Sequence, residues 1–281
     1  MGRVDPLITP ETVAEAMKWG AGFALLDVRW RLGGPPGRQD YEAAHIPSAL
    51  FVDLDTELSS PPGPAGRHPL PDPERLQEVL RRVGVREGGQ VVVYDAGDGS
   101  VAARAWWLLR WAGCREVAVM DGGFAAWQAA GFKVTDHVHD QIPGDFVVRP
   151  GQMPVVDADG AAALARDGAL LDARAPQRYL GETEPIDPKA GHIPGALNAP
   201  SAGHLGDGGR WLSSDELDER FEKIGVKPGE PVGAYCGSGV TASSVVLALE
   251  VAGITSRENP ATLYAGSWSN WCAEDREVAT G

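Results

Sequence analysis

The chain of 281 residues is 43% hydrophobic and carries a net charge of −14 at pH 7. This length favours two domains, and the acidic balance argues against nucleic acid or an anionic membrane surface as a partner. No stretch approaches the roughly twenty apolar residues of a membrane-spanning helix, and the opening residues lack the apolar core of a secretory signal, so we expect a soluble, cytoplasmic protein.

Short apolar runs alternate with helical patterns along the chain. In the first half, strand-like runs at 91–94 (VVVY) and 118–120 (AVM) flank the helical pattern at 100–113. In the second half, the run at 232–235 precedes the pattern at 241–253, which we interpret as an amphipathic helix. Strands that alternate with helices predict an α/β fold with a small parallel sheet covered on both faces. In such sheets the reactive site lies beyond the carboxyl ends of the strands.

The two halves of the chain are copies of each other. Four motifs recur in the same order, each 141 to 147 residues later: LLDVR as LLDAR, HIPSAL as HIPGAL, VVVYD as VGAYC, and DGGFAAW as AGSWSNW. A near-constant shift across four motifs indicates a duplicated domain. The polar stretch at 133–154 is rich in Gly and Pro and has the composition of a linker, which predicts domains of residues 1–140 and 153–281.

Cys236 is the strongest candidate for a reactive group. It follows an apolar strand and precedes a Gly-Ser-Gly loop and a helix. Gly237 and Gly239 allow backbone angles that let successive N–H groups point at one atom, and the helix N-terminus adds the positive end of its dipole. Both features stabilise a thiolate. Cys114 and Cys272 have no such setting, and we interpret them as buried structural thiols.

The first copy has Asp95 at the position that Cys236 has in the second. Because a carboxylate cannot act as a sulfur nucleophile, we expect the domain of residues 1–140 to be catalytically inactive.

An odd total of three cysteines argues for reduced thiols, and no group of Cys and His has the spacing of metal ligands. We therefore expect neither a metal nor a cofactor.

These motifs resemble the tandem rhodanese family. The repeat, DGG..AW, GHIPGA and above all CGSGVT are similar to its 3-mercaptopyruvate sulfurtransferase branch, and the resemblance extends over essentially the whole chain. It implies two tandem rhodanese-like domains. It also implies that Cys236, as a persulfide, carries sulfur from 3-mercaptopyruvate or thiosulfate to a thiol, a thioredoxin-like dithiol or cyanide. Thiosulfate-preferring members have basic residues inside the loop, which CGSGVT lacks.

The resemblance further implies a cation that binds the carboxylate of the sulfur donor. The family has an arginine shortly after the second LLDAR motif, and Arg178 matches it; the alternative interpretation is an exposed surface arginine. A second family arginine aligns with Asp187 here, and Lys189 lies close enough in sequence to replace it. This departure weakens the prediction that mercaptopyruvate is the preferred donor.

A relay of Ser, His and Asp is also implied by the resemblance. Ser238 matches the loop serine, and His68 in GRHPLP and Asp55 in FVDLD match the other two members. A solvated loop histidine is the alternative interpretation of His68. Thr241 offers a second hydroxyl to the sulfur or the substrate, and Val240 completes the predicted substrate-binding loop.

Three other functions are alternatives to 3-mercaptopyruvate sulfurtransferase activity. A cysteine-dependent phosphatase would need an arginine six positions after the cysteine, where this chain has Ala242. A non-catalytic binding or sulfur-relay module would not need the intact Cys236 loop. The third function, thiosulfate:cyanide sulfurtransferase as the main activity, is favoured by Asp187 and disfavoured by the uncharged loop.

Overall fold

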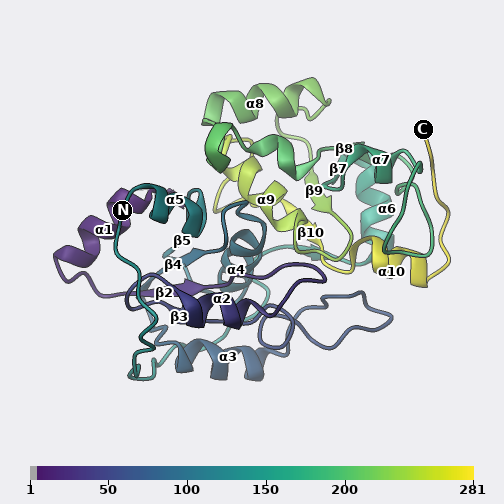
Figure 1. Ribbon diagram of the computed structural model, residues 1–281. Coiled ribbons are helices and arrows are strands. Elements are labelled where there is room, and N and C mark those ends of the chain that lie inside the picture. The colour runs from purple at the N-terminus through teal and green to yellow at the C-terminus, as the bar shows by residue number, and fades with distance from the viewer. Residues whose placement is uncertain (1–4) are drawn as a thin grey trace. The chain divides into compact units, whose positions relative to one another are not determined.

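The computed structural model describes residues 5–281, which divide into two compact units (Figure 1). The first unit contains residues 5–60, Pro71–Gln152 and Gly206–Trp211, and the second contains Pro61–Leu70, Met153–Leu205 and Leu212–Gly281. The units therefore differ from the contiguous domains that the sequence predicts. A short segment of each repeat belongs to the unit that is built mainly from the other repeat.

Hydrogen bonds explain why these two segments change units. The side-chain amide of Asn270 donates to the carbonyl of Pro64 at 2.8 Å, which fixes residues 61–70 in the second unit. In the first unit, the backbone N–H of Trp211 donates to the carboxylate of Asp121 at 2.9 Å. The residues just before Met153, which the sequence assigns to the linker, also pack on the first unit, because the N–H of Arg149 donates to a carbonyl at the end of its central helix.

The first unit has a five-stranded parallel sheet with the strand order β1-β5-β4-β2-β3. Its strands are β1 (Leu7–Ile8), β2 (Phe23–Asp27), β3 (Leu50–Phe51), β4 (Gln90–Tyr94) and β5 (Val117–Met120). Its helices are α1 (Pro10–Lys18), α2 (Gly37–Ala43), α3 (Pro73–Arg82), α4 (Ser100–Trp111), α5 (Gly123–Ala129) and the short 3₁₀ helix η2 (Asp207–Gly209).

The second unit repeats this topology with the strand order β6-β10-β9-β7-β8, again all parallel. Its strands are β6 (Val155–Val156), β7 (Ala169–Asp172), β8 (Leu197–Asn198), β9 (Val232–Tyr235) and β10 (Thr262–Tyr264). Its helices are α6 (Ala158–Asp167), α7 (Pro176–Tyr179), the 3₁₀ helix η1 (Ser201–His204), α8 (Ser214–Lys223), α9 (Ala242–Val251) and α10 (Ser267–Ala273). Two tandem α/β domains with small parallel sheets are thus present, as the sequence predicts.

The helix that follows Cys236 is buried on every side. All residues of α9 from Ala242 to Glu250 are buried, and the helix packs on β9, β10, α8 and η1. The amphipathic helix predicted for 241–253 is therefore wrong, because neighbours cover both its inner and its outer face. The loop before α9 is consequently held between a central strand and a central helix. No helix within residues 5–281 is long and apolar enough to cross a membrane.

Candidate active site

Cys236 follows the last residue of β9 at the carboxyl end of the sheet. Its sulfur accepts a hydrogen bond from the N–H of Gly239 at 3.1 Å, and its own N–H donates to the hydroxyl of Ser267 at 3.1 Å. Its carbonyl accepts from the N–H of Trp268 at 2.9 Å. The side chain is buried, with 3% of the residue exposed. The sulfur therefore has a fixed position, with a backbone donor directed at it.

Gly239 gives the loop its tight turn. Its φ of +81° lies in the left-handed region, and a Cβ at this position would lie 2.5 Å from the carbonyl oxygen of Ala265. Any other residue would be strained in conformation and would also collide with the backbone. Val240 and Thr241 form the turn that leads into α9, since their carbonyls accept the N–H groups of Ser243 and Ser244. No side chain caps the N-terminus of α9.

The equivalent loop in the first unit surrounds a buried carboxyl group with backbone N–H donors. One carboxylate oxygen of Asp95 accepts the N–H groups of Gly97 at 2.9 Å and Gly99 at 3.1 Å, and the other accepts those of Val101 and Ala102, both at 3.1 Å. Burial raises the pKa of this carboxyl group to about 6. Four N–H groups therefore point at the position that Cys236 has in the second repeat, and they lower the pKa of the Asp95 carboxyl against the larger effects of burial and of the neighbouring Asp98.

His68 and Ser238 meet in the Cys236 loop. The Nδ1 of His68 lies 2.8 Å from the hydroxyl oxygen of Ser238, and both residues are buried. His68 is part of the 61–70 segment that the second unit takes from the first repeat, so it is not a solvated loop histidine. Asp55, the third predicted member of the relay, belongs to the first unit, where its carboxylate accepts from the indole N–H of Trp30 at 2.8 Å. Its role in the relay stays a prediction.

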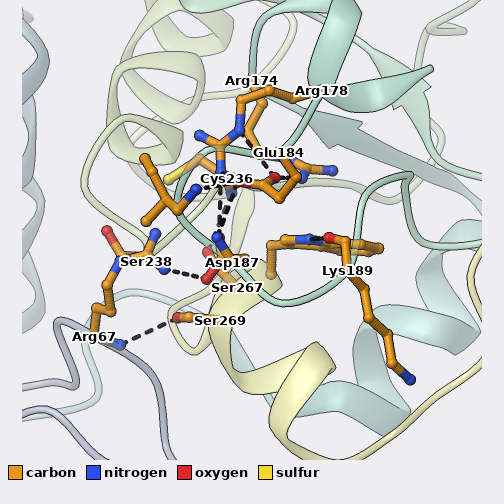
Figure 2. A network of polar contacts seen from close by, with 12 residues as sticks. Arg67, Arg174, Arg178, Glu184, Asp187, Lys189, Cys236, Ser238, Ser267 and Ser269 are labelled. Carbon is orange, nitrogen blue, oxygen red and sulfur yellow. Dashed lines mark hydrogen bonds and ion pairs between the residues drawn. The ribbon is translucent and has the colours of Figure 1, made fainter. Parts of the chain in front are cut away.

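Arg178 belongs to a network of ion pairs beside the Cys236 loop (Figure 2). Its Nε and Nη2 donate to the two carboxylate oxygens of Glu184 at 3.0 and 2.6 Å, and Nη2 also reaches Asp187 at 3.2 Å. The guanidinium group of Arg178 lowers the pKa of Glu184 by hydrogen bonding, against the effect of burial. The side chain of Arg178 is therefore fixed by two carboxylates beside the Cys236 loop, and Arg178 is not a freely exposed arginine.

Arg67 is a second arginine in this network, and the sequence does not predict it. Its guanidinium group is paired with the buried carboxylate of Asp187 (Figure 2). The pairing joins residues 120 positions apart, so no local pattern indicates it. Lys189, which the sequence predicts as the replacement cation, has its ammonium group paired with Asp275 instead. The cation next to position 187 is thus Arg67, because the 61–70 segment joins this unit.

The other two thiols have different surroundings. Cys114 and Cys272 are both buried, and burial raises the pKa of Cys272 to about 11, which disfavours its thiolate. Cys236 is the cysteine that combines a loop donor, a helix N-terminus and nearby arginines. Within residues 5–281, no three His, Cys, Asp or Glu side chains are placed so that they could hold a metal ion.

The fold and this site define the family. The model of the rhodanese-like domain matches the chain twice, at residues 9–130 and 157–274. The chain belongs to the rhodanese family and has two copies of its domain in tandem.

Several relatives match the chain almost from end to end. The chain is 48% identical over 265 residues to a Pseudomonas aeruginosa protein named "Probable 3-mercaptopyruvate sulfurtransferase", covering 92% of each chain. It is 42% identical over 286 residues to the Mycobacterium tuberculosis protein named "Putative thiosulfate sulfurtransferase SseB", covering 99% of this chain and 98% of the relative. The crystal structure of the 3-mercaptopyruvate sulfurtransferase SseA from Escherichia coli superposes with a TM-score of 0.82 at 32% identity, covering 94% of this chain and 99% of that one.

Proposed function

We propose that this enzyme moves a sulfur atom from 3-mercaptopyruvate or thiosulfate to an acceptor through a persulfide on Cys236. The protein is a sulfurtransferase of the 3-mercaptopyruvate or thiosulfate type, the activity for which its full-length relatives are named. One observation carries the assignment of the nucleophile: the loop and helix N-terminus that direct four N–H groups at the Asp95 carboxyl in the first repeat have Cys236 at the same position in the second, with the N–H of Gly239 on its sulfur.

The first half-reaction loads the cysteine. The Cys236 thiolate attacks the sulfur of the donor, forms an S–S bond, and breaks the bond between that sulfur and the rest of the donor. With thiosulfate, the electron pair leaves on sulfite. With 3-mercaptopyruvate, the electron pair leaves on carbon, and the thiol proton of the donor ends on that carbon, which gives pyruvate and a Cys236 persulfide anion.

The proton transfer distinguishes the two donors. A carbon leaving group must be protonated, whereas sulfite needs no proton. The hydroxyl of Ser238, held by Nδ1 of His68 at 2.8 Å, is a suitable group to pass the proton. The N–H groups of the loop and the N-terminus of α9 stabilise the negative charge before and after transfer.

The second half-reaction unloads the persulfide. A thiolate or cyanide attacks the outer sulfur, takes it as a persulfide or as thiocyanate, and leaves the Cys236 thiolate. We propose that the acceptor is a small thiol, a thioredoxin-like dithiol or cyanide. We also propose that the reaction takes place in the cytoplasm.

The Cys236→Ser variant tests this function by steady-state sulfur transfer. We expect the variant to fold normally and to lose transfer from both donors, because an alcohol forms no persulfide. Cys114→Ser and Cys272→Ser are the matched controls, and both should retain nearly full transfer. Substantial turnover by Cys236→Ser would show that another group carries the sulfur.

A further inference from the structure

The 61–70 segment places Arg67 beside the active loop through several fixed contacts. The backbone N–H of Arg67 donates to the hydroxyl of Ser269 at 3.1 Å. Gly63 and Gly66 close the segment with two reciprocal backbone hydrogen bonds of 3.0 and 2.9 Å. The residue after Arg67 is His68, which is bound to Ser238. Arg67 is therefore anchored on both sides in the chain, with its side chain over the site.

The guanidinium groups of Arg67 and Arg178 converge on the residue next to the nucleophile. The Nη2 of Arg67 lies 2.7 Å from the position that a Cβ on Gly237 would occupy, and both Nη atoms of Arg178 lie 3.7 Å from it. Gly237 directly follows Cys236, so a negatively charged group bound by these arginines would lie close to the sulfur. The loop itself contains no basic residue, and the cationic groups nearest to Gly237 are these two side chains, both also paired with carboxylates.

The two arginines differ in the hydrogen bonds that remain for a ligand. Arg178 uses its Nε–Nη2 edge, the side that grips a carboxylate with two parallel bonds, on Glu184. Arg67 uses only Nη1 on Asp187, and its buried Nε has no acceptor among the residues that the structure describes. Since Nε and Nη2 form one planar fork, Arg67 offers a bidentate edge beside Gly237 that no protein carboxylate fills.

We propose that Arg67 is the residue that recognises the negatively charged end of the sulfur donor. It takes the role that the family resemblance gives to an arginine at position 187. In this chain the arginine comes from the 61–70 segment, and Asp187 orients it. The inference rests on the proposed sulfurtransferase function and names the residue that selects the donor. A planar carboxylate next to a carbonyl, as in an α-keto acid, matches the fork.

Donor kinetics of Arg67→Gln test the proposal. The variant keeps a polar side chain of similar length and removes the charge and the fork. We expect kcat/KM for 3-mercaptopyruvate to fall roughly ten- to a hundredfold, mainly through a higher KM, because a charge-assisted bond to the donor is lost. Arg166→Gln is the matched control, because Arg166 is an exposed arginine paired with a neighbouring aspartate, and its kinetics should equal those of wild type.

A second readout separates recognition from a structural role. The enzyme is first loaded with sulfur at saturating donor, and the discharge of the persulfide to cyanide is then timed. Arg67→Gln should load to the wild-type extent and discharge at the wild-type rate, since only donor binding is changed. Slow discharge, or incomplete loading at saturating donor, would mean that Arg67 merely supports the loop and would overturn the proposal.

A charge exchange provides a variant in case Arg67→Gln folds poorly. Arg67→Asp alone should lose donor affinity, because two carboxylates then face each other at this point. Adding Asp187→Arg to it restores the pair in the opposite order and should recover at least tenfold in kcat/KM. A double variant no better than Arg67→Asp would contradict the proposal.

The failure of this inference and the failure of the proposed function give different results. If wild-type enzyme forms no persulfide on Cys236, the function is wrong whatever Arg67 does. If the persulfide forms normally and Arg67→Gln has the wild-type KM for both donors, the function stands and the role of Arg67 is wrong.

Discussion

The two glycines of the active loop should respond very differently to alanine. At Gly237 the new Cβ would lie too close to the end of the Arg67 side chain, 2.7 Å away at Nη2, and at ordinary contact distance from Arg178, and no left-handed φ is required. A movement of roughly 0.7 Å restores ordinary contact, which a long side chain can make at little cost. At Gly239 the new Cβ would need a φ of +81° and would lie 2.5 Å from the backbone oxygen of Ala265.

These contacts give different magnitudes for the two variants. We expect Gly237→Ala to change the free energy of unfolding by less than about 1 kcal/mol and to lower kcat/KM about three- to tenfold, because the fork of Arg67 is displaced. We expect Gly239→Ala to lower the free energy of unfolding by about 2–4 kcal/mol, from conformational strain and the backbone collision. It should also abolish most of the activity, because its N–H no longer points at the sulfur.

Urea unfolding followed by circular dichroism, together with kcat/KM for both donors, measures the two effects. The two variants should differ in stability: Gly237→Ala should lose activity while remaining stable, and Gly239→Ala should lose both activity and stability. If Gly239→Ala were as stable and active as wild type, the loop would not hold the sulfur by the backbone as described here.

Three further predictions concern the ionisable and hydroxyl groups. Burial raises the pKa of Asp95 to about 6, above its ordinary value, so between these two pKa values the folded state binds a proton that the unfolded state has released. The free energy of unfolding should therefore rise as the pH falls from 7 to 4, by at most about 3 kcal/mol relative to Asp95→Asn. If urea unfolding gave wild type and Asp95→Asn the same pH dependence, the assignment would be refuted. Ser238→Ala should lower kcat about tenfold or more with 3-mercaptopyruvate and much less with thiosulfate, because only the first leaving group needs a proton; equal losses with both donors would contradict the relay. Arg178→Ala should lower kcat/KM for both donors by roughly tenfold. Asp187→Arg alone should raise KM and lower the melting temperature, since it removes the carboxylate that pairs with both Arg67 and Arg178 and adds a third guanidinium group beside them. Donor kinetics and thermal unfolding check both variants.

Much of the fold follows from local patterns in the sequence. The repeat, the alternation of strands and helices, and the glycine loop after Cys236 are all contiguous features, and short-range physics determines each of them. The pattern at 241–253 predicts an amphipathic helix and does not predict the burial of α9 on every side. That burial depends on tertiary contacts with other elements, including α8 and η1.

The site was only partly predictable, for the same physical reason. Cys236 and Ser238 lie in one loop, and the loop pattern predicts a role for both. Arg67 lies beside Asp187 and Gly237, which are more than a hundred residues later and become its neighbours only because the 61–70 segment joins the second unit. Lys189 looked suitable by its proximity in sequence alone, and its ammonium group pairs elsewhere.

Mass spectrometry of the loaded enzyme tests the central claim most directly. The protein is incubated with 3-mercaptopyruvate or thiosulfate without an acceptor, denatured without reductant, and digested. We expect the peptide that contains Cys236 to gain about 32 Da in mass, which is one sulfur atom, and to lose this mass again when cyanide is added. A gain on a peptide containing Cys114 or Cys272, or no gain from an enzyme that turns over normally, would contradict it.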